Sequence, residues 1–401
     1  MVDYNQAAGA VSPSRSALTA LSLLVFLDNL GYAVVLPYLY FYILALGGSA
    51  FLYGVVLAAY SLMSFIFTPV VARLSDRYGR RKILLAALAV STVAYLVFGL
   101  AHAVWVLFLG RMLSGTTAAT VPVAQAYVAD VTTPTQRLKY LGFISASAGV
   151  AFILGPAVGG TLSGLYGYAL PSFLCSGLAL VNLVLAYLRL PEPSSFNIKR
   201  TVMSFSALLN VLRKRKVALL LGIYFLFFVA FVFLQAALSP WLKAVFGFGS
   251  LQVGLLFFFF GGVSALSQGV FLPAFGKRFS QLTLALASII VLSIGLLAFA
   301  AAAANLAYVL AVSAVLSIGF GVEIVTINTL ISVNTPKEAQ GGALGVAWAI
   351  AGAAQTIAPI FATAAFSVGV GLGFPGLVFL ISAVISFGTV PLVLAFKKEP
   401  Q

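Results

Sequence analysis

Long apolar segments constrain this chain more than any other feature. Each is long enough to cross a hydrocarbon core of about 30 Å as a helix, and together they span residues 17–41, 51–72, 83–101, 104–129, 140–163, 168–188, 217–241, 250–273, 280–301, 304–332, 341–364 and 372–396. Only 7% of the 401 residues are charged, against about a quarter in soluble chains. No segment alternates as a barrel strand does. We therefore predict an all-α membrane protein with twelve transmembrane helices.

The positive charges predict how the chain crosses the membrane. Of the 22 lysines and arginines, all but Arg111 and Lys243 lie near a terminus or in alternate loops, beginning with loop 73–82. Because cytoplasmic loops carry the excess of Lys and Arg, both termini are predicted to be cytoplasmic. The net charge of +14 then reflects topology and attraction to lipid. We expect a multi-pass protein of the cell (plasma or inner) membrane, with no nucleic acid as partner.

The longest connection divides the apolar segments six and six. The predicted domains are an N-terminal tail (1–16), an N-terminal half (17–188), a linker (189–216), a C-terminal half (217–396) and a C-terminal tail (397–401). The sequence TPTQRLKYLG at Thr133 recurs as TPKEAQGGALG at Thr335, and an offset of 203 then aligns Pro156 with Pro359. Two parallel six-helix repeats with a substrate path at their interface are typical of secondary transporters.

Three charged residues, Asp28, Arg111 and Glu323, lie deep within apolar segments. A charge at that depth is costly and is usually functional. A carboxyl group there can bind and release a proton near neutral pH. We predict that Asp28 and Glu323 couple transport to protons and that Arg111 tunes one of them. A structural ion pair is the alternative for Arg111.

Uncharged polar and aromatic residues at similar depth are candidates to line a substrate cavity. Hydrogen bonding between helices explains any single Gln or Asn equally well. The candidates are Asn29, Tyr32, Gln125, Tyr224, Gln235, Gln268, Asn328, Trp348 and Gln355. The chain has one cysteine and one histidine, and it shows no metal-ligand cluster, nucleophile–base pair or phosphate loop. We therefore expect no metal, no cofactor and no enzymatic activity.

Two motifs resemble those of the major facilitator superfamily. VVARLSDRYGRRK (Val70–Lys82) resembles the signature loop between the second and third helices, and GRMLSG contains Arg111 in a pattern similar to the Arg-x-x-x-Gly motif of the fourth helix. The resemblance implies a role for Arg111 in proton or substrate coupling. It also implies a cytoplasmic gate that engages a helix of the other half, with the members Asp76, Arg77, Gly79, Arg80, Arg81 and Asp130.

The fifth segment, GFISASAGVAFILGPAVGG, carries a third motif. Its small residues indicate close helix packing, and its proline permits a bend. It also resembles the antiporter signature of drug-proton exchangers, with Ala151 in place of one glycine, and the matching residues are Gly142, Gly155, Pro156, Gly159 and Gly160. Segments 3 and 9 carry no acid and loop 42–50 no arginine, where tetracycline exporters have functional charges. The resemblance therefore does not extend to specificity for magnesium–tetracycline.

The resemblance is greatest to the twelve-helix drug-proton antiporters, including tetracycline exporters. It implies two six-helix halves that export hydrophobic or amphipathic small molecules in exchange for protons by alternating access. The predicted partners are thus a small-molecule substrate, protons and the lipid bilayer, and we expect a monomer. Alternatives are a proton-coupled symporter or facilitator of an organic anion bound by Arg111, and a lipid transporter on the same fold.

Overall fold

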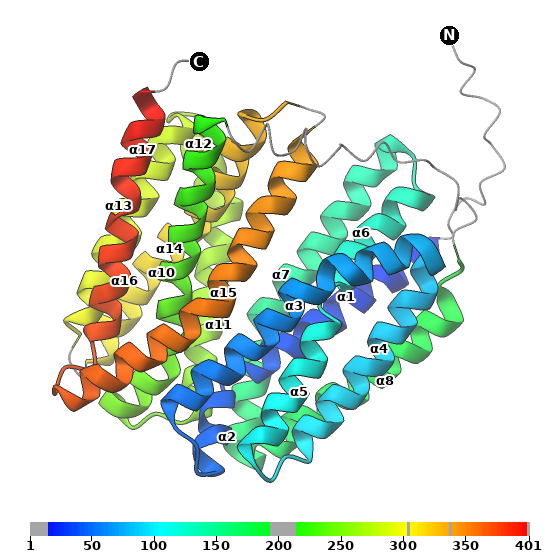
Figure 1. Cartoon of the computed structure of the whole chain (residues 1–401), viewed down its shortest axis with the longest axis horizontal. Helices are drawn as coiled ribbons and strands as arrows, with labels where there is room; N and C mark the ends of the chain where they lie inside the picture. The colour runs from blue at the N-terminus through cyan, green and yellow to red at the C-terminus, as the bar shows by residue number, and fades with distance from the viewer. Residues whose placement is uncertain (1–14, 193–213, 303–304, 337–338, 399–401) are drawn as a thin grey trace. The chain divides into compact units, whose positions relative to one another are not determined.

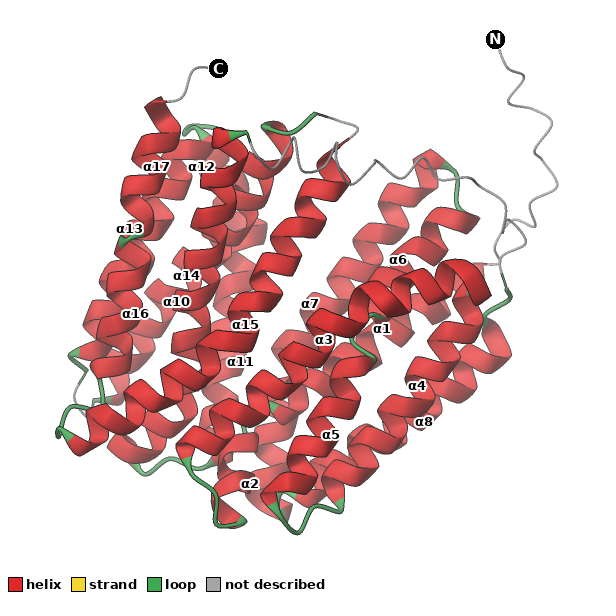
Figure 2. Cartoon of the chain, in the orientation of Figure 1, coloured by secondary structure: helices red, strands yellow, loops and turns green. Residues whose placement is uncertain are grey.

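The chain folds into helices throughout the part that the structure describes. The computed structural model describes residues 15–192, 214–302, 305–336 and 339–398, and the regular elements in these ranges are all helical (Figures 1 and 2). Twelve spans in these ranges are long and apolar enough to cross a membrane, as predicted. The remaining parts of the predicted tails and linker lie outside the described residues.

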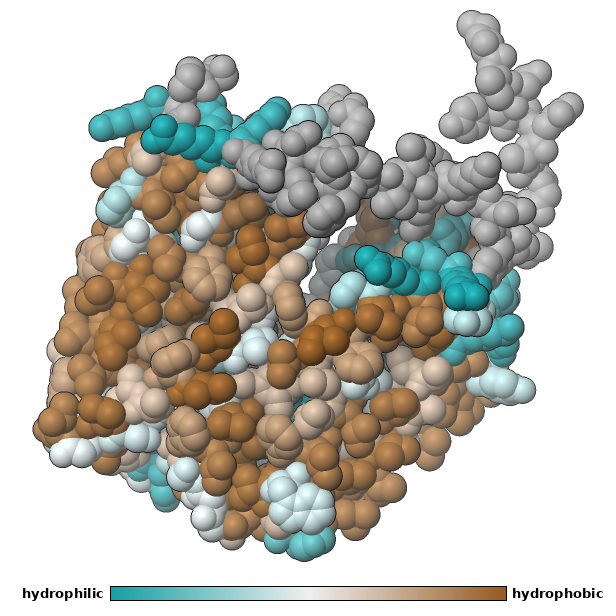
Figure 3. Space-filling view, in the orientation of Figure 1, coloured by the Kyte–Doolittle hydropathy of each residue, from teal (hydrophilic) through white to brown (hydrophobic). Residues whose placement is uncertain are grey.

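The first half contains six spans, and the short helix α2 lies between the first and the second of them. The spans are covered with apolar side chains because lipid is their solvent, and Figure 3 shows hydrophobic residues along the helix flanks and hydrophilic ones near helix ends. The helices are α1 (Arg15–Val35), α2 (Leu39–Ala45), α3 (Ala50–Tyr78), α4 (Arg80–Gly99), α5 (Val104–Thr116), α6 (Thr120–Val131), α7 (Pro134–Tyr166) and α8 (Ala169–Arg189).

The second half likewise contains six spans. One of them includes a short π-helix, η1 (Ser267–Phe271), between two α-helical parts. The elements are α10 (Arg215–Phe246), α11 (Ser250–Leu266), η1, α12 (Leu272–Gly276), α13 (Gln281–Ala300), α14 (Leu306–Val333), α15 (Gln340–Gly371), α16 (Leu377–Phe387) and α17 (Thr389–Lys398).

The chain forms two compact units. One unit comprises Met1–Leu36 and Met63–Arg200, and the other comprises Pro37–Leu62 and Thr201–Gln401. Residues 37–62, which include α2 and the start of α3, thus cluster with the second unit. Within the first apolar segment, the continuous helix α1 ends at Val35, two residues before Pro37. Proline has no backbone N–H to donate, so it interrupts the helical hydrogen-bond pattern.

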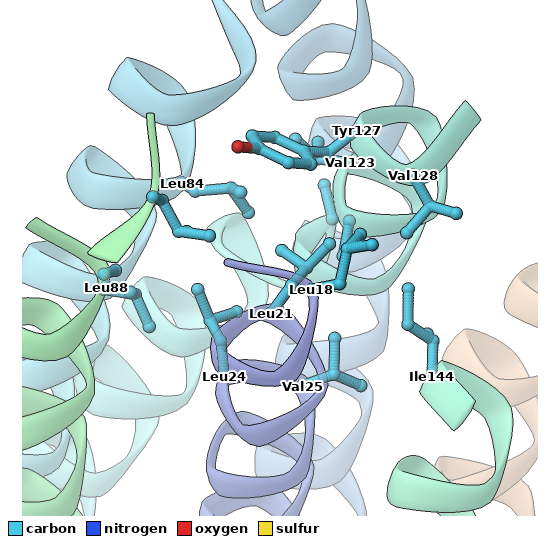
Figure 4. Packing of buried hydrophobic residues seen from close by; sticks show 14 residues of the cluster. Leu18, Leu21, Leu24, Val25, Leu84, Leu88, Val123, Tyr127, Val128 and Ile144 are labelled. Carbon is cyan, nitrogen blue, oxygen red and sulfur yellow. The ribbon is translucent and has the colours of Figure 1, made fainter. Parts of the chain in front are cut away.

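The first unit is held together by a buried apolar cluster around α1. Leu18, Leu21, Leu24 and Val25 of α1 meet side chains of α4, α6 and α7 (Figure 4). The members from these other helices include Leu84, Leu88, Val123, Tyr127, Val128 and Ile144. This packing fixes the register of α1, which carries Asp28 one turn beyond the cluster.

Both halves use the same helix pairings. In the first half, α1 packs against α7, and α4 packs against both α5 and α8. In the second half, α10 packs against α15, and α13 packs against both α14 and α16. The first span therefore pairs with the fifth, and the third with the fourth and the sixth, in each half. This repetition agrees with the duplicated pattern around Thr133 and Thr335.

Candidate functional site

The Asp28 carboxyl group lies against the start of α6. Its side chain is hydrogen bonded to the hydroxyl of Thr120, the first residue of that helix. The N-terminus of a helix carries partial positive charge, so this position favours an acidic partner. Asp28 remains partly exposed, whereas Thr120 is buried. The neighbouring Asn29 donates to the Val25 carbonyl on its own helix, at 2.8 Å.

The helix start at Thr120 exists because the fourth span is broken. The apolar pattern predicts one uninterrupted segment over residues 104–129, but α5 ends at Thr116 and α6 begins at Thr120. The Thr117 hydroxyl donates to the Ser114 carbonyl at 2.9 Å and shares a 2.8 Å hydrogen bond with Ser91. Such side-chain bonds compete with the helical backbone pattern. Interrupted helices that place a helix terminus at membrane depth are typical of ion and substrate sites in transporters.

Arg111 lies one helix away, between aromatic rings. Its guanidinium carbon is 5.7 Å from the ring centroid of Tyr32 and 5.6 Å from that of Phe98, and the residue is buried. A cation over an aromatic face is attracted by the ring quadrupole. The Tyr32 ring also makes an edge contact with Phe152 of α7 at 5.7 Å. Asp28 and Tyr32 are four residues apart on α1, so one face of that helix carries both groups.

Glu323 has a different setting, within the second compact unit. It is 1% exposed, and its Oε2 has no hydrogen-bond partner among the described residues. Gly319, one turn earlier on the same face of α14, packs against the backbone of Leu292 and Ser288 in α13. Glu323 lies on the same face of α14 as Gly319. An ionised oxygen without a partner is costly in an apolar interior, and a carboxyl group that holds a proton there avoids that cost.

The predicted cavity residues of the second half fall into two groups. Tyr224, Asn328 and Trp348 lie close together: the Tyr224 side chain neighbours Asn328 and its ring centroid is 6.5 Å from that of Trp348. Trp348 is 55% exposed, which leaves it free to contact a ligand. The other group, Gln235, Gln268 and Gln355, is spread over α10, η1 and α15, and Gln125 of the first half is exposed on α6.

The loop between α3 and α4 contains a charge network centred on Arg80. Its Nε donates to Asp130 Oδ2 at 3.0 Å, its Nη1 donates to the Ser75 hydroxyl at 2.6 Å, and it forms an ion pair with Asp76. Arg80 and Asp130 have side-chain exposures of 8% and 16%, and Asp76 is mostly exposed at 57%. Four predicted gate residues thus divide into a buried core, Arg80 with Asp130, and an exposed pair, Asp76 and Arg77.

The other two predicted gate residues, Gly79 and Arg81, contact a residue that sequence analysis left out. The Arg81 backbone N–H donates to Glu192 Oε1 at 3.2 Å, and a side chain at Gly79 would collide with the same carboxylate. Tyr127 of α6 also donates to the Pro191 carbonyl at 2.7 Å. The run Leu190–Pro191–Glu192, an acid directly after an apolar segment, was the available signal.

The glycines of α7 do not share one role. Gly155 and Gly159 bring α7 against the backbone of α1 at Ala33 and Val34, where no Cβ would fit. Gly160 is buried, and Pro156 lies inside α7. Gly142 differs from the expectation of a continuous packing face, because it is exposed and an added Cβ would meet no described atom within 4 Å. The close contact thus begins only in the second part of the helix.

Metal coordination has no candidate in the part of the chain that the structure describes. The described residues contain no group of three or more His, Cys, Asp or Glu side chains placed to hold a metal ion. Cys175 is a free, buried thiol.

Comparison with known proteins identifies the family from the sequence. The model of the Major Facilitator Superfamily matches residues 21–359. The class C tetracycline resistance protein of Escherichia coli is 32% identical over 298 residues, 72% of this chain and 74% of that protein. Multidrug resistance protein 2 of Bacillus subtilis (strain 168) is 32% identical over 211 residues, 52% of this chain and 51% of that protein.

The fold is shared with a solved structure of a bacterial homologue of the human lysosomal transporter Spinster. The two structures superimpose with a TM-score of 0.77 at 17% sequence identity, and the match covers 95% of this chain and 96% of that chain. The predicted integral, multi-pass membrane protein is thus confirmed. Proteins of this family and fold are transporters, and transporters are not enzymes. The chain belongs to the Major Facilitator Superfamily.

Proposed function

We propose that this protein exports hydrophobic or amphipathic small molecules in exchange for protons, by alternating access and as a monomer. Its relatives support export, since they include resistance proteins for tetracycline and for multiple drugs. The absence of acids from segments 3 and 9 argues for amphipathic molecules in general rather than for a magnesium–tetracycline complex.

The observation that carries the proposal is the setting of Asp28. This acid lies at membrane depth, is partly exposed, and has a hydroxyl and a helix N-terminus as its neighbours. A protonated carboxyl group can donate to the Thr120 oxygen, and an ionised one can accept from the Thr120 hydroxyl. The site therefore accommodates both protonation states. Arg111 is held between Tyr32 and Phe98, and we assign it the role of a positive charge that is coupled to Asp28 through the shared face of α1 that carries Tyr32.

Glu323 is the second proton-binding group of the proposal. Its burial isolates it from solvent, so that a proton moves to or from it only when the surrounding helices shift. Substrate binding is assigned to the remaining cavity residues, above all to the exposed ring of Trp348 beside Tyr224. We assign two further roles. The hinge is the Gly155–Gly160 part of α7, and the cytoplasmic gate is formed by Asp76, Arg77, Gly79, Arg80, Arg81 and Asp130.

Transport by the purified protein in proteoliposomes tests the proposal. An acidic lumen drives proton efflux, and we expect it to drive accumulation of ethidium or tetracycline compared with protein-free vesicles. Asp28→Asn and Glu323→Gln are expected to abolish the dependence on the pH gradient. The matched variants Asp28→Glu and Glu323→Asp keep a carboxyl group and are expected to retain it.

Three results contradict the proposal. Uptake of benzoate driven by an acidic exterior, without drug accumulation, identifies an organic-anion symporter. Movement of a fluorescent phosphatidylcholine between leaflets, again without drug accumulation, identifies a lipid transporter. If neither Asp28→Asn nor Glu323→Gln changes the coupling to protons, the assignment of these two acids is wrong.

A further inference from the structure

Helix α4 begins without a cap of its own. Its N-cap residue is Gly79, at φ 112° and ψ 140°, and glycine has no side chain to accept from the first free backbone N–H groups. Ser, Thr, Asp or Asn normally supply that acceptor, but their side chains strain the backbone at a φ of this sign. The signature loop thus creates an uncapped helix start within the charge network.

Glu192 supplies the missing acceptor from 111 residues further along the chain. Its Oε1 accepts from the backbone N–H of Arg81, the second residue of α4, at 3.2 Å. A Cβ at Gly79 would lie 2.6 Å from Oε1 and 2.8 Å from Cδ of Glu192. Glycine is therefore required at this position for two reasons. Its backbone has a positive φ, and the Glu192 carboxylate occupies the space that a side chain would need. A negative charge at this end of a helix is also favoured by the helix dipole.

The segment that carries Glu192 is attached to three helices. Its Pro191 carbonyl accepts from the Tyr127 hydroxyl of α6 at 2.7 Å. The Arg81 side chain of α4 donates to the Tyr187 carbonyl near the end of α8 at 2.7 Å and stacks over the Tyr187 ring at 5.2 Å. The connection between the two halves continues from residue 193. Its starting point is thereby fixed to the signature loop.

We propose that Glu192 is a positioning residue of the cytoplasmic gate, a role that rests on the transport function proposed above. Its carboxylate caps α4 in place of a local side chain and ties the start of the linker to Gly79 and Arg81. Any movement of the loop away from α8 breaks this contact. The gate network thus includes the first residues of the linker as well as the charged loop.

Hydrogen exchange of the full-length protein in nanodiscs tests the cap directly. For Glu192→Ala we expect the amides in the first turn of α4 to exchange about fivefold faster, the usual effect of losing an N-cap. Glu192→Gln keeps an acceptor oxygen without the charge and is expected to give an intermediate rate. The matched control is Ser280→Ala, since Ser280 caps α13 locally by accepting from the Thr283 N–H at 3.2 Å. That variant is expected to accelerate exchange in α13 and to leave α4 unchanged.

Ethidium transport in proteoliposomes tests the positioning role. We expect Glu192→Ala to lower the maximal rate severalfold with an unchanged KM, because the residue acts on the gate and not on the substrate. Ser280→Ala is expected to keep the wild-type rate.

Unchanged exchange in α4 of Glu192→Ala overturns the cap. Faster exchange with a wild-type maximal rate overturns the positioning role. If the wild-type protein transports no ethidium under any gradient, the proposed function fails for this probe, while the exchange result still decides whether Glu192 caps α4.

Discussion

The two halves share a scaffold but differ at equivalent positions of the fourth span. In the first half this span is interrupted between Thr116 and Thr120, and Asp28 meets the new helix start. In the second half the equivalent helix, α14, is continuous from Leu306 to Val333 and carries its acid, Glu323, on a buried face. One duplicated unit thus contains a partly exposed acid, and the other contains a fully buried one.

The loops between the second and third spans differ in the same way. The first-half loop holds its helix start through Arg80, Asp130 and Glu192, which come from three separate segments. The second-half loop uses the local Ser280 cap, and its Arg278 is exposed. The comparison teaches that the duplication preserved the helix pairings, while the ion pairs found among the described residues both lie in the first half.

The largest effect is expected where α7 meets α1. Gly159→Ala places a Cβ against the Val34 carbonyl oxygen, and relief requires the two helices to separate, so we expect a loss of about 3 kcal/mol in unfolding free energy. The equivalent residue of α15, 203 positions later, is Ala362. Ala362→Gly is expected to cost only about 1 kcal/mol. Thermal unfolding of both variants in detergent checks the difference, and equal losses contradict it.

A somewhat smaller effect is expected from Arg80→Ala. Removing this side chain breaks the ion pair between Arg80 and the largely buried Asp130, at an expected cost of about 2 kcal/mol. Arg278→Ala in the second-half loop removes an exposed side chain and is expected to change stability by less than about 0.5 kcal/mol. The same melts measure both variants. A larger loss for Arg278→Ala reverses the comparison of the two loops.

Glycine substitutions in the two loops are expected to act in opposite directions. Gly79→Ala strains a backbone at φ 112° and displaces Glu192, so we expect a loss of about 1–2 kcal/mol. Gly276 lies at the end of α12, and an added Cβ there meets no described atom within 4 Å. Gly276→Ala is therefore expected to stabilise the protein by about 0.5 kcal/mol. A stabilising Gly79→Ala refutes the role assigned to Glu192.

A small effect on stability is expected at Thr120, where the readout is transport. Thr120→Val removes the hydroxyl that bonds Asp28, a contribution of about 1 kcal/mol, and is expected to change the pH profile of ethidium efflux. Thr120→Ser keeps the hydroxyl and serves as the control. An unchanged profile in Thr120→Val contradicts the idea that the helix start at Thr120 tunes Asp28.

Much of the fold was predictable because membrane spans are read from local composition. A run of about twenty apolar residues has few alternatives in a bilayer, so the twelve spans follow from the sequence. The depth of Asp28, Arg111 and Glu323 follows from the same pattern. The break at Thr117 was not predictable, since it depends on hydroxyl contacts with Ser91 of another helix. The exposure of Gly142 depends in the same way on where α7 approaches α1.

By itself, the sequence determined the class of protein, the number of spans and the presence of three deep charges, since each of these depends on residues near one another in the chain. Only the tertiary structure decided which groups those charges meet. The partners come from other helices or distant segments. Asp28 meets Thr120, Arg111 meets Tyr32 and Phe98, and the start of α4 meets Glu192. Such partners depend on helix packing, which a one-dimensional pattern of apolar residues does not specify.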